Sequence, residues 1–487
     1  MSNATANPTA ITTEGPIEGS YVGEQARFLG IPYAQAPEGE LAFEAPQRAK
    51  KHDGVFLATE FGATPQRRAF GPVTTIPEPV IPGAETLNLN IFAPKNAKPG
   101  DKLPVLFYIH GGGFVAGSHV GSWFHGESFN RNDVILVTIS YRLGFKGFGF
   151  IEDAPNNRGL LDMLMALQWV NENIANFGGD PAAITIAGQS AGGGAVLCLM
   201  SMPAARGLFQ QAIPHSAAPS ARMLATAKVE AQRIANFAGV ANTKAGWASV
   251  SEDVLLDAQA KTVALATEQS GVPVPGLGGA LAQTLADNGL SIDFGPILDD
   301  ATQPTDAFEA LKNLNPDVPV LMGATSEEFM MPTSMAGNPD ADRQIIEAIL
   351  KPGRYETDLR YALNANHSTP LGLAITNVFF HRAVRDAVAA RPKQLYTYLF
   401  DYPSSVSGRA GHCLELPFAF DCLNDPHVAV VFGPANQAVA DDMHAAWVSF
   451  IKTGKPGWGD ATTNECRVWQ ADGGHTVHLE NGEAYAR

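Results

Sequence analysis

Short apolar runs and longer amphipathic stretches alternate through the middle of the chain. Residues 103–109, 134–140 and 183–187 form near-continuous apolar runs rich in β-branched and aromatic side chains, a pattern typical of parallel strands covered on both faces. Between the second and third runs, residues 159–177 carry apolar side chains at helical spacing. Because parallel strands need a crossover connection, the pattern predicts a parallel sheet whose strands are joined by helices.

Other segments extend this predicted sheet or interrupt it. Residues 222–290 and 332–391 are mostly helical by pattern and lie between predicted strands, so we expect them to form excursions above the sheet. Residues 35–84 are rich in proline and glycine and predict long surface loops. The remaining predicted elements are a polar leader at 1–10, a hairpin over 15–32, strands at 87–92, 211–214, 318–323, 395–400 and 475–479, and a C-terminal helix over 436–453.

The pentapeptide GQSAG, residues 188–192, stands between a predicted strand and a run of small and apolar residues at 191–202. Strand, sharp turn and helix is the context in which G-x-S-x-G forms a nucleophile elbow. The strained turn requires small neighbours on both sides of the serine, and glycine and alanine provide them. We predict that Ser190 is a catalytic nucleophile held above the sheet. A glycine-rich turn that happens to contain serine is the alternative.

Three consecutive glycines follow the predicted strand at 103–109, in the sequence HGGGF at 110–114. Glycines let backbone N–H groups approach a developing oxyanion without obstruction by side chains. Together with the N–H of Ala191 they would supply three donors, so we predict an oxyanion hole here, with His110 orienting the loop. A flexible loop without this role is the alternative.

An acyl-transfer site also needs a base and an orienting acid, and in this topology they follow the serine in the order acid, then histidine. His412 is our candidate base, because it lies in a glycine-containing loop after the last predicted core strand. His215, which ends the strand after the elbow, is the rival. The strand at 318–323 leads into Glu327 and Glu328, and the residues alone do not choose between these carboxylates. The weaker candidates for the acid are Asp299 and Asp300, and a solvated loop with two charges is the alternative.

Composition narrows the possible partners and the compartment. The chain of 487 residues has a formal net charge of −16, which disfavours nucleic acid and anionic membranes as partners. It contains no apolar run of about 18 residues that could span a membrane, and its first residues lack the basic and apolar regions of a secretory signal. Its four cysteines show no C-x-x-C spacing and no disulfide framework, which indicates free thiols in a reducing compartment. We therefore expect a cytoplasmic protein.

Four motifs, together with the serine pentapeptide, give the sequence its resemblance to a known family. It resembles the type-B carboxylesterases, the α/β-hydrolases that include bacterial para-nitrobenzyl esterases and the cholinesterases. The resemblance runs from about residue 15 to the C-terminal helix. It implies a single α/β-hydrolase domain over 1–487, with a doubly wound, mostly parallel central sheet and helical insertions, about 222–290 and 332–391, that form a gorge over Ser190. The motifs are FLGIPYA at 28–34, LNLN at 87–90, HGGGF at 110–114 and IANFGGDP at 174–181.

The resemblance also assigns site residues one by one. Ser190 falls on the nucleophile, His412 on the base in its H-x-x-E-L-x-F context, and Glu328 on the acid. The remaining assignments are Gly112, Gly113 and Ala191 for the oxyanion donors, Ser216 for a partner of the acid, and Glu415 for a residue that packs near the site without reacting.

Several positions depart from the family's pattern. The usual glutamate before the nucleophile is Gln189, the glycine often found three residues before the base is Arg409, and the glycine often found just after it is Cys413. The usual Glu-Asp-Cys before the strand at 87–92 reads Ala-Glu-Thr, so the family's N-terminal disulfide is absent. No tryptophan precedes Trp123, so the cholinesterase cation site has no counterpart, and we do not expect choline esters as substrates.

These inferences predict a serine carboxylesterase that hydrolyses small to medium, uncharged esters through an acyl-enzyme. It would use a Ser-His-Glu triad and no metal or organic cofactor, and we expect a monomer or a small homo-oligomer. A carbamate or amide hydrolase with the same triad is the alternative. A non-catalytic cholinesterase-like binding protein is disfavoured because every part of the site is present. Predicted substrate contacts or gorge walls are Phe114, Gln189, Trp123, Ile292 and Phe294.

Overall fold

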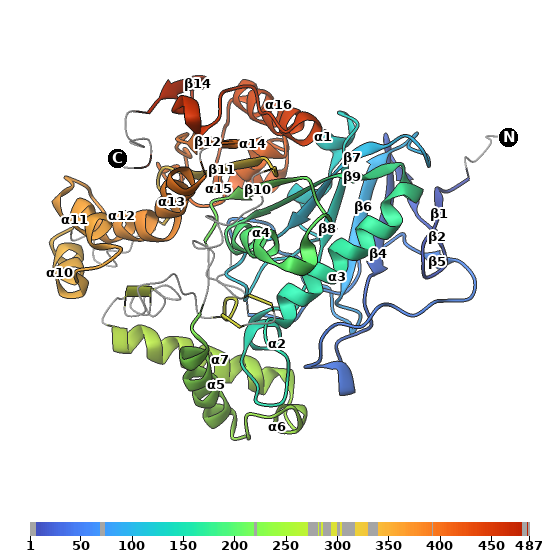
Figure 1. Ribbon diagram of the computed structural model, residues 1–487, viewed down its shortest axis with the longest axis horizontal. Coiled ribbons are helices and arrows are strands. Elements are labelled where there is room, and N and C mark those ends of the chain that lie inside the picture. Colours follow the sequence, from blue (N-terminus) through green and yellow to red (C-terminus); the bar gives the residue numbers. More distant parts are fainter. Residues whose placement is uncertain are drawn as a thin grey trace.

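A large central sheet organises the molecule (Figure 1). The structure, a computed structural model, describes residues 6–68, 74–218, 222–270, 281, 284–285, 294–299, 302–303, 317–329, 339–391, 393–479 and 485. Within these residues the large sheet has 11 strands and a small sheet near the N-terminus has 3. In spatial order the large sheet contains β14 (Gly473–His478), β13 (Glu465–Gln470), β12 (Leu395–Phe400), β11 (Val320–Thr325), β10 (Gln211–His215), β9 (Gly179–Gln189), β7 (Leu103–Ile109), β8 (Ile135–Ile139), β6 (Asn88–Pro94), β4 (Gln25–Pro32) and β3 (Ser20–Val22). The small sheet contains β1 (Thr9–Ile11), β2 (Pro16–Glu18) and β5 (Phe56–Leu57).

The interior strands of the large sheet run parallel, as the apolar runs predict. Neighbouring strands from β8 through β7, β9, β10, β11 and β12 to β13 pair in parallel, whereas β14 and the strands β6, β4 and β3 pair antiparallel. The predicted strands at 103–109 and 395–400 match β7 and β12 residue for residue. Because the carboxyl ends of parallel strands meet at one edge of a sheet, ligand sites form at that edge.

Both faces of the sheet are covered, which makes the fold doubly wound. Along β7, Val105 and Phe107 belong to one buried cluster with residues of α3 and α4, whereas Leu106 and Tyr108 belong to a second cluster with residues of α16. This alternation follows from the two-residue period of a strand. The crossover predicted at 159–177 is α3 (Arg158–Asn173) followed by a 3₁₀ turn, η3 (Ile174–Phe177). The helices α4 (Ala191–Ser201) and α16 (Gln437–Thr453) also belong to these layers.

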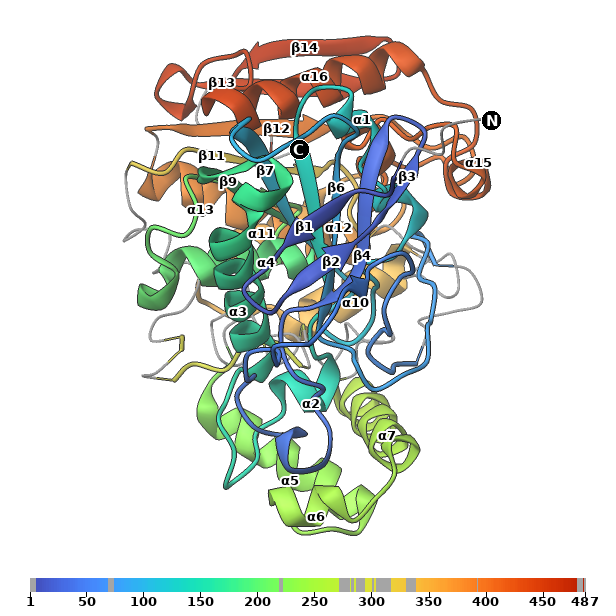
Figure 2. The same ribbon diagram turned by 90° about the vertical axis from the view of Figure 1, so that its right-hand side faces the viewer.

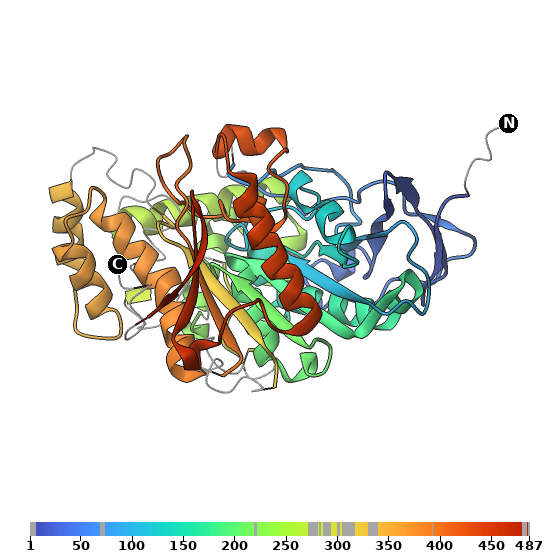
Figure 3. The same cartoon turned by 90° about the horizontal axis from the view of Figure 1, so that it is seen from above.

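The two predicted helical excursions lie in different parts of the molecule. The first contains α5 (Leu224–Ala238), α6 (Lys244–Ala248) and α7 (Glu252–Ser270), which gather at the end opposite β14 and α16 (Figure 2). The second contains α10 (Pro339–Ile349), α11 (Glu356–Asn364), α12 (Pro370–Thr376) and α13 (Arg382–Ala390), and it lies on the side away from the N-terminus (Figure 3). The shorter helices are α1 (Glu127–Asn130), α2 (Gly144–Phe148), α14 (Leu416–Ala419) and α15 (Pro426–Val431).

Two sequence predictions need correction at the ends of the chain. Residues 9–11 form strand β1, which pairs with β2, so the polar leader is shorter than predicted. The single strand predicted at 475–479 is the second half of a hairpin, because β13 pairs with β14. All four cysteines are free, as predicted. In the part of the chain that the structure describes, no helix combines the length and apolar character needed to cross a bilayer.

Candidate active site

Ser190 occupies the sharp turn between β9 and α4, as the sequence predicts. Its backbone adopts φ +58° and ψ −121°, a conformation that costs on the order of 1–3 kcal/mol for a residue with a side chain. Ser190 N donates to His215 O at 3.0 Å, and Gly194 N donates to Ser190 O at 2.9 Å. These hydrogen bonds fix the strained turn, and Ser190 is only partly buried, so a reacting group can reach it.

The glycines around Ser190 are required by close backbone contacts. A Cβ on Gly188 would lie 2.4 Å from Gly192 O, and a Cβ on Gly192 would lie 2.2 Å from Ile109 O. Both distances are far shorter than the optimum separation of non-bonded carbon atoms, which is about 3.5–4.0 Å. The GQSAG motif therefore packs the elbow directly against the end of β7.

The glycine run after β7 lies beside the nucleophile. A Cβ on Gly111 would be 3.2 Å from Ser190 Cβ, and Gly112 and Gly113 have φ values of +111° and +61°. Among the described residues, no acceptor forms a hydrogen bond with the N–H of Gly112 or Gly113. Ala191 is the first residue of α4, so its N–H has no partner within the helix. The site thus contains the free backbone donors that an oxyanion hole needs.

His412 and Glu328 meet in the loops that follow β12 and β11. His412 Nδ1 contacts Glu328 Oε2, and His412 N donates to Glu328 O at 3.0 Å. The second carboxylate oxygen, Oε1, accepts from Thr325 N at 2.8 Å. The Glu328 side chain is fully buried, whereas the His412 side chain is 14% exposed. In this geometry an acid can fix the tautomer and the orientation of a base.

Opposing effects act on the carboxyl group of Glu328. Burial favours the neutral acid, but the imidazole of His412 and the N–H of Thr325 favour the carboxylate, and the pKa of the carboxyl is held below the usual value. Ser216 follows β10, and its backbone N–H donates to Gly323 O at 2.8 Å. Glu328 is therefore ionised at neutral pH, which is the state that orients a histidine.

Glu327, the neighbouring carboxylate, has different partners. Its Oε1 pairs with Arg409 Nη1 at 2.5 Å, and its Oε2 accepts from Ala410 N at 3.3 Å. Its side chain is 22% exposed. The structure thus distinguishes two carboxylates between which the residue pattern alone does not choose. Arg409, one of the departures from the family pattern, ties the loop of His412 to the loop of Glu328.

The structure lacks a hydrogen bond between Ser190 Oγ and His412 Nε2. Within the described residues Ser190 Oγ forms no hydrogen bond, and His412 Nε2 lies 3.2 Å from Gln189 Nε2. An amide N–H can donate only to an unprotonated ring nitrogen, which leaves the ring proton on Nδ1, towards Glu328. Since Gln189 directly precedes Ser190, this contact ties the imidazole to the end of the strand that carries the nucleophile. Hydrogen bonds of this kind often tighten only when substrate is bound.

Two aromatic rings pack beside His412. The ring centroids of Phe329 and Phe380 lie 4.8 Å and 4.9 Å from the imidazole and 5.5 Å from each other. Phe380 belongs to a π-helical turn, η5 (Asn377–His381), between α12 and α13. Single phenylalanines in helical segments carry no pattern that marks a site, so sequence reasoning does not find them. They make the surroundings of the base apolar.

His215, the rival base, and His110 are buried with other partners. Trp447 Nε1 donates to His215 Nε2 at 3.1 Å, and Tyr398 OH lies 3.3 Å from His215 Nδ1. His110 Nδ1 lies 2.8 Å from a carbonyl oxygen of the glycine run. Burial lowers the pKa of both rings to about 3, so both stay neutral at physiological pH. The geometry favours His412 over His215 as the base.

These two histidines give a testable dependence of stability on pH. The ordinary pKa of histidine is about 6.5 in an unfolded chain, so below that pH the unfolded state binds more protons than the folded state. We expect the free energy of unfolding to fall as the pH drops from 6.5 towards 3, by up to about 1.4 kcal/mol per pH unit for each ring. The free energy of unfolding of a His215→Gln variant, measured by urea unfolding at each pH, should depend less steeply on pH between 6.5 and 4.5, by that amount. The same substitution at exposed His475 is the control. An unchanged dependence of the free energy of unfolding on pH in the His215 variant would contradict the lowered pKa of His215.

Cys413 and Glu415 complete the buried surroundings of the base. Cys413 has φ +72°, in the backbone region that favours glycine, which agrees with the glycine often found at this position in the family. Burial, together with the nearby Glu328, raises the pKa of Glu415 well above its usual value. Neither carboxyl oxygen of Glu415 has a hydrogen-bond partner in the described chain. Burial without a hydrogen-bond partner therefore favours the neutral acid at Glu415.

We expect Glu415→Gln to keep nearly wild-type stability, because glutamine replaces one neutral, similarly shaped group with another. Glu415→Ala should lose about 1–3 kcal/mol through the cavity it leaves. Thermal unfolding of both variants measures the difference. Equal losses in the two variants would indicate a charged Glu415 with a partner.

The residues predicted to contact substrate are buried. Phe114 and Phe294 belong to one core cluster and Trp123 to the other. Gln189 is fully buried and faces His412. A role of these four side chains in substrate contact stays a prediction.

Asp299, a weaker candidate for the acid, is engaged in its own turn. Its Oδ1 accepts from the N–H of Thr302 at 2.6 Å and from the hydroxyl of Thr302 at 2.7 Å. Two predicted positions, Ile292 and Asp300, lie outside the described residues.

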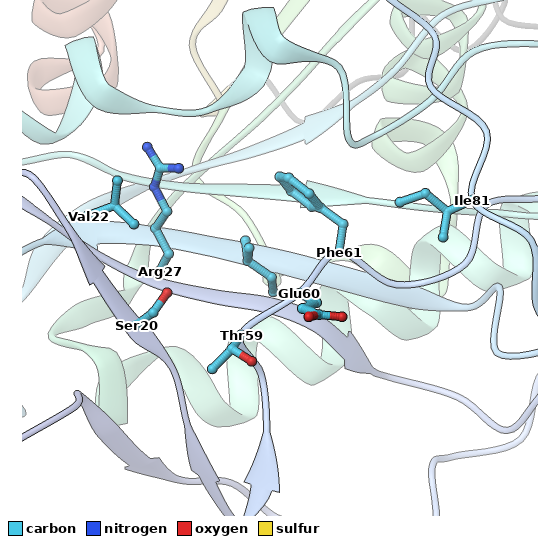
Figure 4. Close-up of a pocket in the computed structure, with 8 residues that line it drawn as sticks. Ser20, Val22, Arg27, Thr59, Glu60, Phe61 and Ile81 are labelled. Atoms are coloured by element: carbon cyan, nitrogen blue, oxygen red, sulfur yellow. The ribbon is translucent and has the colours of Figure 1, made fainter.

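A separate hollow of about 510 Å³ lies at the β3 edge of the sheet and shares no residue with this site. The side chains of Arg27 on β4 and Phe61 stand on opposite sides of it (Figure 4). Arg27 donates to Gln25 Oε1, so its guanidinium is already engaged within the strand. This hollow adds nothing to the chemistry at Ser190.

The fold and the site together define a class of protein. A mostly parallel sheet with helices on both faces, and an elbow serine followed in chain order by an acid and a histidine, are the marks of the α/β-hydrolases. The sequence model of the Carboxylesterase family matches residues 6–367. The chain therefore belongs to the carboxylesterase family, and it is a carboxylic ester hydrolase.

Individual relatives agree with this family. The chain is 31% identical over 467 residues to the para-nitrobenzyl esterase of Bacillus subtilis (strain 168), covering 92% of this chain and 90% of the relative. It is 31% identical over 496 residues to the phenmedipham hydrolase of Pseudarthrobacter oxydans, covering 95% and 92%. The solved structure of a thermophilic PNB esterase superposes with a TM-score of 0.83 at 26% identity, covering 99% of each chain.

Proposed function

We propose that the protein hydrolyses small to medium, uncharged carboxylic esters through an acyl-enzyme on Ser190. His412 acts as the general base and Glu328 as the acid that orients it. The contact between His412 Nδ1 and the buried Glu328 carboxylate carries this proposal, because it leaves His412 Nε2 as the acceptor beside the elbow.

The proposed reaction has two halves. His412 Nε2 takes the proton of Ser190 as Oγ attacks the ester carbonyl, and Glu328 stabilises the imidazolium that forms. The N–H groups of Gly112, Gly113 and Ala191 bind the tetrahedral oxyanion. His412 then protonates the departing alcohol, and water repeats the sequence on the acyl-enzyme.

The surroundings of the base support a preference for uncharged, apolar substrates. Phe329 and Phe380 pack beside His412, and the net charge of −16 disfavours anionic esters. The four free thiols support the expectation of a reducing, cytoplasmic compartment.

A carbamate hydrolase is the second candidate, favoured by the similarity to a phenmedipham hydrolase along nearly the whole chain. Esters, carbamates and amides all pass through the same oxyanion chemistry, so the triad does not separate them. A panel of three substrates, a p-nitrophenyl ester, an aryl carbamate and an anilide, measures the preference. The preference is the ratio of kcat/KM between any two of them. We expect the ester to be hydrolysed fastest. A carbamate that is turned over faster would make the second candidate the function.

A further inference from the structure

A buried ion pair closes the described parts of the loop at 64–81. Arg67 Nε lies 3.6 Å from Glu78 Oε2, and the two side chains are 2% and 11% exposed. Arg67 Nη2 also donates to the carbonyl oxygens of Glu78 and Pro79, at 3.1 Å and 3.2 Å, and Nη1 donates to Pro65 O at 3.3 Å. The buried guanidinium therefore holds the two ends of the loop together, because it donates to carbonyl oxygens at both of them.

The same carboxylate reaches the segment behind the glycine run. Glu78 Oε2 accepts from Gly117 N at 3.3 Å, and the next residue, Ser118, donates its hydroxyl proton to a carbonyl oxygen of the loop at 3.1 Å. A Cβ on Gly117 would lie 2.1 Å from Gly111 O, and a Cβ on Gly112 would lie 2.8 Å from Gly117 N. Gly117 is thus packed against Gly111 and Gly112 of the glycine run, and its N–H is held by Glu78.

Burial of this pair is costly, so stability alone is a weak reason for it. Burial raises the pKa of Glu78 and lowers the pKa of Arg67, which means that both charged forms are penalised. The attraction within a buried ion pair often fails to offset its desolvation, and apolar replacements are often as stable. The pair also contacts Gly117, behind the glycine run. A role in fixing the geometry of that segment would explain both the buried pair and this contact.

We propose that Arg67 and Glu78 are positioning residues that hold the glycine run at 111–113 in the geometry for binding an oxyanion. The proposal rests on the proposed function, because it concerns how the N–H groups of Gly112 and Gly113 are aimed. It assigns no chemical step to either residue. The ion pair fixes this loop in a chain whose four cysteines are all free.

The test compares three proteins: wild type, the double variant Arg67→Met/Glu78→Met, and the control Arg48→Met/Glu172→Met. The first substitution pair removes both buried charges and leaves no unpaired ion. The control removes an ion pair whose side chains are 54% and 36% exposed. For each protein we would measure kcat and KM for a p-nitrophenyl ester and the Ki of an alkyl trifluoromethyl ketone, which mimics the tetrahedral intermediate. Hydrogen exchange over residues 110–118 provides a readout that does not depend on activity.

In the double variant we expect kcat to fall about tenfold to a hundredfold and the ketone Ki to rise by a similar factor, since small misplacements of a catalytic group have effects of this size. KM should change less than about threefold, because ground-state binding does not use the oxyanion donors. Exchange over 110–118 should be faster than in wild type and in the control.

Unchanged kcat and ketone affinity in the folded double variant would overturn the proposal, as would unchanged exchange protection over 110–118. If the double variant does not fold, Glu78→Gln, which keeps the shape and weakens the ion pair, is measured in the same way with the same criteria. A wild-type protein that neither hydrolyses the ester nor binds the ketone would contradict the proposed function instead, and the exchange measurement would still decide the positioning role.

Discussion

Ser190→Ala is expected to abolish ester hydrolysis, with a loss in kcat on the order of 10⁶-fold, as for other enzymes that lose a triad serine. The reason is that no acyl-enzyme can form without Oγ, and the free donors of the glycine run then have no covalent intermediate to stabilise. Steady-state hydrolysis of p-nitrophenyl butyrate measures the loss.

The matched control is Ser201→Ala, at the other end of α4. Ser201 Oγ donates to Cys198 O at 2.8 Å, so this substitution removes a serine hydroxyl from the same helix without touching the elbow. We expect the control to keep nearly full activity and both variants to keep the circular dichroism of the wild type. Turnover retained by the Ser190 variant would exclude the elbow as the nucleophile.

Glu328→Gln is expected to lose about 10⁴-fold in kcat, by analogy with amide replacements of triad acids that leave the geometry intact. An amide at this position no longer stabilises the imidazolium, and its NH₂ group can select the wrong tautomer of His412. Because the pKa of the Glu328 carboxyl is held below its usual value, its folding contribution is present above pH 4.5 and is lost as the pH falls through the lowered pKa.

Glu327→Gln is the matched control, one residue away in the same loop. We expect it to lose less than about tenfold in kcat, because it weakens the contact with Arg409 but leaves His412 on Glu328. The expected loss in kcat is small because partly exposed ion pairs contribute little. The opposite ranking of the two variants would move the acid to position 327.

Much of the fold is predictable because its signals are local in the sequence. The parallel strands are continuous apolar runs, and β7 and β12 match the predicted ranges residue for residue. The elbow is equally local, since Gly188 and Gly192 are forced by contacts within one turn and with the end of the adjacent strand. The hairpin of β13 and β14 is missed in part, because β13 alternates buried and partly buried residues and so shows no continuous apolar run.

The candidate site is only partly predictable, because several contacts join residues far apart in the chain. The residue pattern alone does not choose between Glu327 and Glu328; the choice follows from which carboxylate is buried against His412. Nothing local in the sequence marks Phe329 or Phe380 as neighbours of that ring. Similarly, the position of Gln189 between the elbow and the base follows from packing, not from the motif that contains it.

The central claim is that Ser190, His412 and Glu328 act as one unit. A crystal structure of the trifluoromethyl ketone adduct tests it most directly, through the distance from His412 Nε2 to the Oγ of the modified serine. We expect the adduct on Ser190, with that distance near 3 Å as general-base catalysis requires, about 2.6–3.2 Å, and with the ketone oxygen facing the N–H groups of Gly112, Gly113 and Ala191. An adduct on another residue, or an imidazole at position 412 that stays on Gln189 beyond reach of the serine, would contradict it.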